Sequence, residues 1–223
     1  MSICIIVINK VVINSLYNKF KNSKYPVIFI TDLPINEEIK NVVYYDNKDC
    51  DNRLFYGSGV NRGRGWDKCI RYIVENNKFD YYWILEDDVY FKNLNFIEDY
   101  KNNNSDFIYP KYYNSFTNKW PHFNDYNLRY FKKDVIRGST SYICRLSNTL
   151  VNKIELFKNT FKKLLFHEVL FASLSAVFKL KTSKMLSKHE KYLNTMERGD
   201  NIIDIMYNDN IDLYHPVKNW HRL

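Results

Sequence analysis

The sequence predicts an α/β fold in which a Rossmann-like, mostly parallel central sheet is flanked by helices. Short β-branched, apolar runs alternate with helical patterns at a spacing of roughly 20 residues, as in doubly wound sheets. The chain has 223 residues, which is enough for one α/β domain with a sizeable core. We therefore expect a single domain over 1–223, built from an N-terminal half, 1–90, and a C-terminal half, 91–223.

The first half alternates between strands and helices. Residues 2–9 (SICIIVIN) form a continuous β-branched run, typical of a strand that is covered on both faces. A helical pattern from Ile13 to Phe20 follows, and Pro26 then precedes a second buried strand, VIFIT. Residues 41–46 form a third strand, and the strongest strand of the middle region is FDYYWILEDDV at 79–89, which runs from apolar residues into three carboxylates.

The second half is predicted to contain both secondary-structure types. In order, we expect a weak helix at 95–101, a strand at 107–110, an aromatic stretch at 111–133, a strand at 139–146 and helices at 148–157 and 161–178. Ser147 is a suitable N-cap for the first of these two helices. The tail from Met185 onward is charged, and we expect it to be irregular.

The composition describes a folded, basic protein. Hydrophobic residues make up 45% of the chain, which excludes an intrinsically disordered chain. The formal net charge is +8, so a partner should carry negative charge: nucleic acid, a membrane surface or a phosphorylated small molecule. The 19 Tyr and 15 Phe accompany abundant Lys, Asn and Ile. This bias is typical of an AT-rich genome, such as that of a large DNA virus.

The cysteines and the N-terminus indicate a reducing compartment. Cys4, Cys50, Cys69 and Cys144 are scattered, without a C-x-x-C pair, and should be reduced core residues. The first apolar run is interrupted by Asn9 and Lys10, far short of the ~20 apolar residues of a membrane span. We expect no signal peptide, no membrane span and a cytoplasmic location, in the host cytoplasm or virion if the protein is viral.

Three consecutive carboxylates, Glu86, Asp87 and Asp88, follow the apolar strand directly. Ligands of open α/β sheets bind at the carboxyl ends of the strands, and adjacent carboxylates repel one another unless a cation or solvent compensates them. Oxygen ligands at this density suit Mn²⁺ or Mg²⁺. A solvated acidic turn is the alternative interpretation.

Helix, apolar strand and carboxylates stand in the order WDKCIRYIVENNKFDYYWILEDDVYF. This arrangement resembles the GT-A superfamily of nucleotide-sugar glycosyltransferases, with the Asp-x-Asp-type motif in an E-D-D form. The resemblance implies transfer of a hexosyl or N-acetylhexosaminyl group from a UDP- or GDP-sugar to a hydroxyl acceptor on a glycan or protein. Asp88 would bind the metal, Mn²⁺ or Mg²⁺, while Glu86 and Asp87 would support the sugar nucleotide. The N-terminal half would bind the donor and the C-terminal half the acceptor.

The predicted donor-binding residues lie at strand ends and in one glycine-rich loop. The segment 57–65 (GSGVNRGRG) fits neither a Rossmann fingerprint nor a Walker A loop. It carries Arg62 and Arg64 to a helix N-terminus, which suits phosphate, although a plain surface loop is equally compatible. Three further residues complete the predicted donor-binding set: Asn9, Tyr45 and Asp46. The second strand ends TDLP, not in the Asp-Asp-Gly-Ser that is common in the largest family of this fold, so the nucleobase contacts are not specified.

Two later segments supply the remaining candidates. Glu168 stands in the apolar helix KKLLFHEVLFASLSAVF, and inverting GT-A enzymes place a general base at the start of such a helix. A polar helix edge capped by His167 and Glu168 is the alternative. His215 in YHPVK would complete the metal shell, and Lys218 would neutralise the departing diphosphate. Aromatic residues available for acceptor stacking are Tyr109, Tyr112, Tyr113, Phe116, Trp120, Phe123 and Tyr126.

Two other functional classes fit parts of the pattern. A metal-dependent nucleotidyltransferase would share the carboxylates but release pyrophosphate. A non-catalytic nucleic-acid-binding domain would use the net charge and aromatic stacking, but an acidic triplet at a sheet edge repels phosphate when no metal is bound. We therefore expect a nucleotide-sugar, and not nucleic acid, as the partner.

Overall fold

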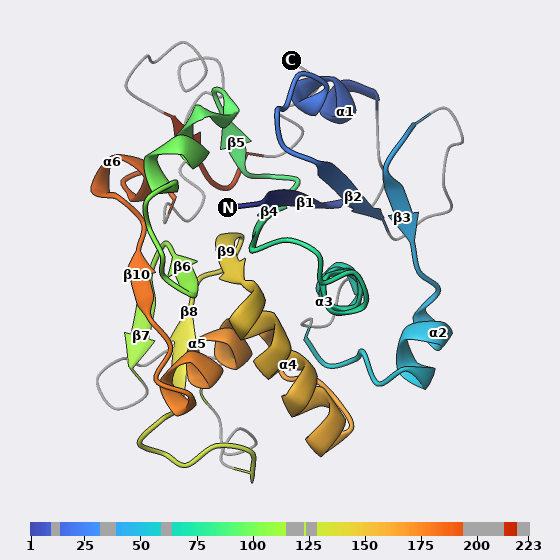
Figure 1. Cartoon of the computed structure of the whole chain (residues 1–223), viewed down its shortest axis with the longest axis vertical. Coiled ribbons are helices and arrows are strands. Elements are labelled where there is room, and N and C mark those ends of the chain that lie inside the picture. Colours follow the sequence, from blue (N-terminus) through green and yellow to red (C-terminus); the bar gives the residue numbers. More distant parts are fainter. Residues whose placement is uncertain are drawn as a thin grey trace.

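The computed structural model describes residues 1–9, 14–31, 39–58, 64–114, 123, 129–193 and 212–217. Seven strands form one sheet in the order β10-β6-β9-β4-β1-β2-β3 (Figure 1). Their bounds are β1 Ile3–Asn9, β2 Val27–Thr31, β3 Val42–Tyr44, β4 Tyr81–Glu86, β6 Phe107–Tyr109, β9 Ile143–Ser147 and β10 Thr182–Lys184. Only β9 runs antiparallel to its neighbours, β4 and β6. The mostly parallel α/β fold class is therefore confirmed.

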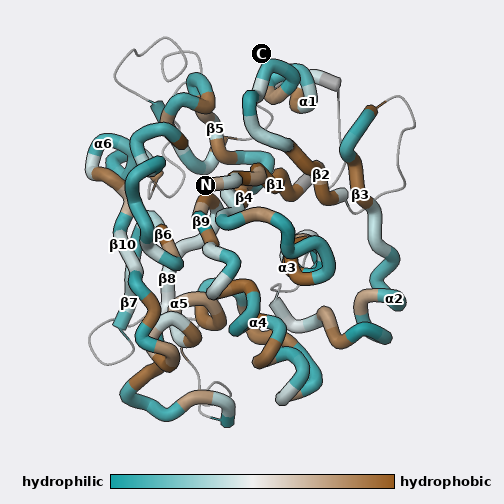
Figure 2. The backbone as a smooth tube through the Cα atoms, in the orientation of Figure 1, coloured by the Kyte–Doolittle hydropathy of each residue, from teal (hydrophilic) through white to brown (hydrophobic). Residues whose placement is uncertain are grey.

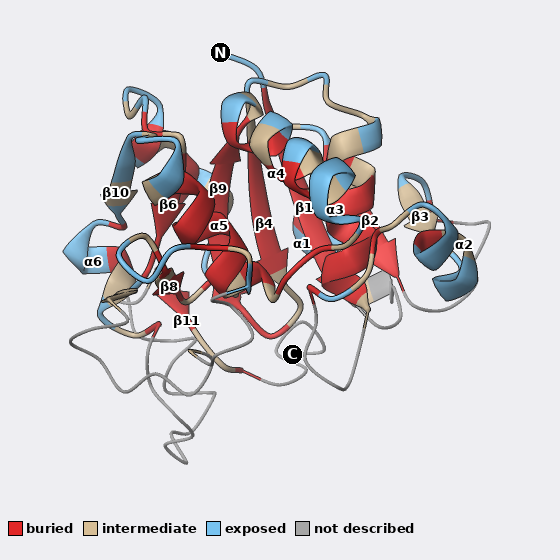
Figure 3. Cartoon of the chain, turned by 90° about the horizontal axis from the view of Figure 1, so that it is seen from below, coloured by how far each residue is buried: buried red, intermediate tan, exposed pale blue. Residues whose placement is uncertain are grey.

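The central strands are apolar on both faces. Ile3 to Ile8 of β1 pair with Tyr81 to Glu86 of β4 in parallel register. Alternate side chains of a strand point to opposite faces, and here both sets are buried (Figure 3). Strand β1 is largely brown in Figure 2, in keeping with the unbroken apolar run that is typical of a strand covered on both faces.

Helices α3 (Gly65–Glu75), α4 (Asn148–Phe161) and α5 (His167–Val177) pack on one face of the sheet (Figure 1). A Cβ atom on Gly65 would lie only 2.5 Å from Cγ2 of Ile8, so a glycine permits the close approach of α3 to β1. Ser147 caps α4, because its Oγ accepts from the backbone N–H of Leu150 at 3.1 Å, as predicted.

The other face of the sheet is covered by smaller elements. These are α1 (Asn14–Phe20), the 3₁₀ helix η1 (Leu94–Tyr100), α6 (Ser187–Glu190) and the antiparallel pair β5 (Tyr90–Phe91) with β11 (Leu213–Tyr214). Phe20 of α1 packs against Phe29 and Phe91, with ring centroids 5.6 and 4.8 Å away. Helix α2 (Asn47–Asn52) adds Cys50 to the core on the face of α3, and β7 (Tyr112–Asn114) pairs antiparallel with β8 (Arg137–Ser139) in a separate two-stranded sheet.

Three sequence predictions are wrong in detail. The strand expected at 139–146 is two strands, because β8 ends at Ser139 and β9 begins at Ile143. The helix expected at 161–178 is broken: Lys162 adopts a left-handed conformation (φ 59°) that ends α4, and α5 begins only at His167. The tail is not irregular throughout, since α6 and β11 both lie in it.

All four cysteines are buried and free, as predicted. Burial raises the pKa of each thiol, which makes these side chains unreactive members of the core. Among the helices that the structure describes, none has the length and apolar character needed to cross a bilayer.

Candidate active site at the carboxyl end of β4

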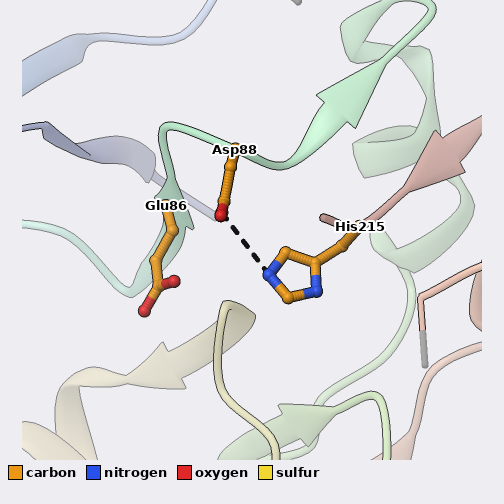
Figure 4. A group of neighbouring side chains, drawn as sticks. All are labelled: Glu86, Asp88 and His215. Atoms are coloured by element: carbon orange, nitrogen blue, oxygen red, sulfur yellow. Dashed lines mark ion pairs between the residues drawn. The ribbon is translucent and has the colours of Figure 1, made fainter. Parts of the chain in front are cut away.

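Three side chains from distant parts of the chain meet at the carboxyl end of β4. Glu86 is the last residue of β4, Asp88 follows in the next turn, and His215 comes directly after β11. One ligand atom from each lies within 4.8 Å of the others (Figure 4). His215 Nε2 lies 3.4 Å from Asp88 Oδ1. Two carboxylates and one imidazole at this spacing fit a divalent cation such as Mn²⁺.

The pairing of β5 with β11 brings His215 to this edge. Leu213 pairs with Phe91, and Tyr214 pairs with Tyr90. The backbone N–H of Val217 then donates to the carbonyl oxygen of Asp88 at 2.8 Å. The segment after β11 is thus hydrogen-bonded to the turn that carries Asp88.

An aromatic stack orients the imidazole of His215. The Tyr142 ring lies 3.8 Å from the His215 ring, centroid to centroid, at an interplanar angle of 10°. The backbone N–H of His215 donates to the carbonyl oxygen of Tyr192 at 3.2 Å. A ring held on one face and at its backbone presents its nitrogens in a defined direction.

The electrostatics of the cluster favour a bound cation. Burial raises the pKa of Glu86, and the neighbouring charge of Asp88 raises it further. Asp88 is only 8% exposed. Two carboxylates this close and this poorly solvated repel each other, and a cation between them removes that cost.

Trp66 connects the carboxylate cluster to α5. Its indole Nε1 donates to Glu86 Oε1 at 2.7 Å, and its ring stacks on His167 with centroids 3.9 Å apart at 10°. His167 Nδ1 lies 2.8 Å from the carbonyl oxygen of Ser58. We did not predict Trp66 as a site residue, although its place in the first turn of the helix after the glycine-rich loop was a usable signal.

Glu168 lies in the first turn of α5, directly after His167. Its Oε1 accepts from the backbone N–H of Ser141 at 2.9 Å. Burial raises the pKa of Glu168 to about 8, and the charge of Glu86 adds to this, although the Ser141 hydrogen bond opposes the rise. A carboxyl group with a pKa near neutrality is suited to general acid–base work.

Arg64 does not have a free guanidinium for phosphate. Its side chain pairs with Asp51 at 2.6 Å and with Asp67 at 3.0 Å, and it also donates to the carbonyl oxygens of Asn47 and Phe55. The sequence placed this arginine correctly at the start of α3. These contacts join α2 to α3, and the role of Arg64 in binding the donor stays a prediction.

The other residues predicted to bind the donor lie at several separate places in the structure. Asp46 is the N-cap of α2 and accepts from the backbone N–H of Lys48 at 2.8 Å. The Tyr45 ring lies 4.0 Å from the Arg71 guanidinium, and Asp87 is partly exposed between Glu86 and Asp88. Outside the described part of the structure lie Arg62, Lys218 and the side chain of Asn9.

The structure describes four of the seven aromatic residues predicted to bind an acceptor. Tyr109 is buried against Phe107, with ring centroids 5.2 Å apart, and is a core residue. Tyr112 and Tyr113 are half-buried in β7, and Phe123 is also half-buried. Phe116, Trp120 and Tyr126 lie outside the described residues.

No protein-family model and no curated protein matches this sequence. Among solved structures, the chain is similar to mouse xyloside xylosyltransferase 1 in its apo form, at 12% identity over 96% of each chain and a TM-score of 0.49. It is also similar to the galactosyltransferase LgtC in complex with donor and acceptor sugar analogues, at 10% identity over 85% of this chain and 74% of that chain and a TM-score of 0.46.

A third similar structure is a glycosyltransferase involved in the glycosylation of the major capsid of PBCV-1. Its identity is 8% over 85% of this chain and 83% of that chain, with a TM-score of 0.39. Similarities at such low sequence identity concern the fold alone. The proposal for the function is therefore based on the side chains of the site.

Proposed function

We propose that this chain is a metal-dependent glycosyltransferase of the GT-A type, which moves a sugar from a nucleoside-diphosphate sugar to a hydroxyl acceptor. The observation that carries the proposal is the convergence of Glu86, Asp88 and His215 at the carboxyl end of β4, the edge at which open α/β sheets bind ligands. A partly buried carboxyl group, Glu168, lies in the first turn of α5, the helix that Trp66 contacts through His167.

In this proposal Glu86, Asp88 and His215 hold Mn²⁺ or Mg²⁺. A bound divalent cation supplies positive charge that stabilises a leaving diphosphate. The sequence assigned Glu86 to the sugar nucleotide, and its place in the cluster now favours a ligand role. Asp87, which is partly exposed in the same turn, remains the candidate for contacting the sugar nucleotide.

The remaining chemistry is assigned to side chains of this chain. If the reaction inverts, Glu168 accepts the proton of the acceptor hydroxyl. The acceptor oxygen then forms its bond to the sugar while the bond between the sugar and the diphosphate breaks. We keep Arg62 and Lys218 as the groups that neutralise the diphosphate, and Asn9, Tyr45 and Asp46 as further donor contacts.

The test is product analysis with purified protein, Mn²⁺ and a panel of UDP- and GDP-sugars. We expect release of nucleoside diphosphate, a loss of at least about a hundredfold in Asp88→Ala, and full activity in the exposed control Asp134→Ala. Equal release by wild type and Asp88→Ala with every donor would overturn the proposal. Release of pyrophosphate from nucleoside triphosphates would instead identify a nucleotidyltransferase.

A further inference from the structure

An apolar groove lies on the helical side of the molecule, separate from the carboxylate cluster. It has a volume of about 450 Å³ and is formed by residues 130–135, the C-terminal half of α4 and the C-terminal end of α5. Its centre is an aromatic group, in which Phe157 packs on Phe131 and Phe161 with ring centroids 5.4 and 4.7 Å apart.

The rim of the groove exposes large apolar side chains. Leu156 is 50% exposed, Phe161 39%, Val177 40% and Phe178 36%. These are four of the six large hydrophobic residues that are exposed in the described part of the chain. An exposed apolar patch that is concentrated in this way marks a contact surface.

Positive charge surrounds the same groove. Lys132 lines it, Lys153 Nζ lies 4.6 Å from the centre of the Phe178 ring, and Lys162 and Lys179 directly follow Phe161 and Phe178. Over 129–135, 153–163 and 177–181, nine residues are basic and only two, Asp134 and Glu155, are acidic. Each of the three elements that form the groove therefore contributes lysine to its rim.

We propose that this face binds an anionic membrane surface. Interfacial binding needs apolar side chains that enter the boundary between headgroups and acyl chains, together with basic residues at the level of the headgroups. Lysines on all three lining elements match a plane of negative charge. A second copy of this chain would bring the same lysines face to face, and like charges oppose that contact.

The geometry leaves the candidate active site free. The groove is at the C-terminal end of α5, whereas Glu168 is in the first turn of that helix. Helix α5 has eleven residues, so its two ends lie about 15 Å apart at the rise of an α-helix. The proposal stands independently of the catalytic assignment, since it depends on none of Glu86, Asp88 and His215.

The experiment is vesicle flotation with the full chain. We expect wild type to float with vesicles of equimolar phosphatidylcholine and phosphatidylserine, and not with phosphatidylcholine alone. Lys132→Glu/Lys179→Glu should weaken the binding at least about thirtyfold. Leu156→Ser/Phe161→Ser retains the charges and should weaken it about tenfold, since both side chains are already partly exposed and the fold should persist.

The matched control is Lys48→Glu/Lys101→Glu, which changes the net charge equally at exposed positions on α2 and after η1. It should bind anionic vesicles within about twofold of wild type. Equal weakening in this control, or no flotation of wild type with anionic vesicles, would overturn the proposal. A wild-type dimer that Leu156→Ser/Phe161→Ser converts to a monomer would also overturn it, by assigning the groove to a second copy.

Discussion

The indole nitrogen of Trp66 donates to the carboxylate of Glu86 at 2.7 Å. The same ring stacks on His167, so one side chain touches both the end of β4 and the beginning of α5. A hydrogen bond to one oxygen of Glu86 restricts the direction of that carboxylate. Trp66 therefore positions a candidate metal ligand and the helix that carries Glu168.

Replacing Trp66 tests this relationship. Trp66→Phe retains an aromatic ring against His167 but removes the donor to Glu86. We expect Mn²⁺ affinity to fall by about tenfold to a hundredfold, the range for lost hydrogen bonds to metal ligands, while the melting temperature changes little. Calorimetric titration with Mn²⁺ measures the affinity. Unchanged affinity in a folded Trp66→Phe protein would show that the indole N–H does not position Glu86.

The Tyr142 ring should support metal binding through His215. Tyr142→Ala removes the ring that stacks on the imidazole at 3.8 Å, so we expect Mn²⁺ affinity to fall about tenfold. Tyr142→Phe retains the stacking ring and should bind Mn²⁺ as wild type does. Equal losses in the two variants would assign the effect to the hydroxyl group and contradict a role for stacking.

Glu168 should make stability depend on pH. Burial raises its pKa in the folded state to about 8, above the ordinary value of 4.5. Between these values the folded chain holds a proton that the unfolded chain has released, so stability falls as pH rises. Below pH 4.5 the group is protonated in both states and contributes no pH dependence.

The matching variant is Glu168→Gln, which retains an oxygen for the N–H of Ser141. The melting temperature of Glu168→Gln minus that of wild type should increase between about pH 5 and pH 8, and this difference should be constant above that range. Differential scanning fluorimetry without added metal measures this. The control Glu155→Gln, on α4, should follow the wild-type curve, and parallel curves for Glu168→Gln and wild type would contradict the raised pKa.

The contact between α3 and β1 makes Gly65 sensitive to substitution. In Gly65→Ala the new Cβ would lie 2.5 Å from Ile8 Cγ2, so we expect a loss of about 1–3 kcal/mol in the free energy of unfolding. Ile8→Ala makes room for that Cβ. The double variant should therefore be more stable than the sum of the two single losses predicts, as measured by urea denaturation. Additive losses would show that the two atoms do not clash.

Local patterns predicted much of the fold because they depend on neighbouring residues. The apolar run of β1, the strand that ends in Glu86 and the Ser147 cap all follow from side-chain spacing over a few positions. The break at Lys162 does not, because a non-glycine residue with a positive φ is uncommon and the neighbouring residues carry no glycine or proline that would predict it. The N–H of Leu164 donates to the carbonyl oxygen of Tyr56 in that segment.

By itself, the sequence determined that an apolar strand ends in three carboxylates and that His215 and Glu168 are candidates for the same chemistry. The tertiary structure decided which of these groups meet. Pairing of β11 with β5 brings His215 to Asp88, and packing of α3 brings Trp66 to Glu86. It also places the Arg64 guanidinium against Asp51 and Asp67. Spacing along the chain specifies a strand or a cap, whereas contacts between distant residues depend on how the layers pack.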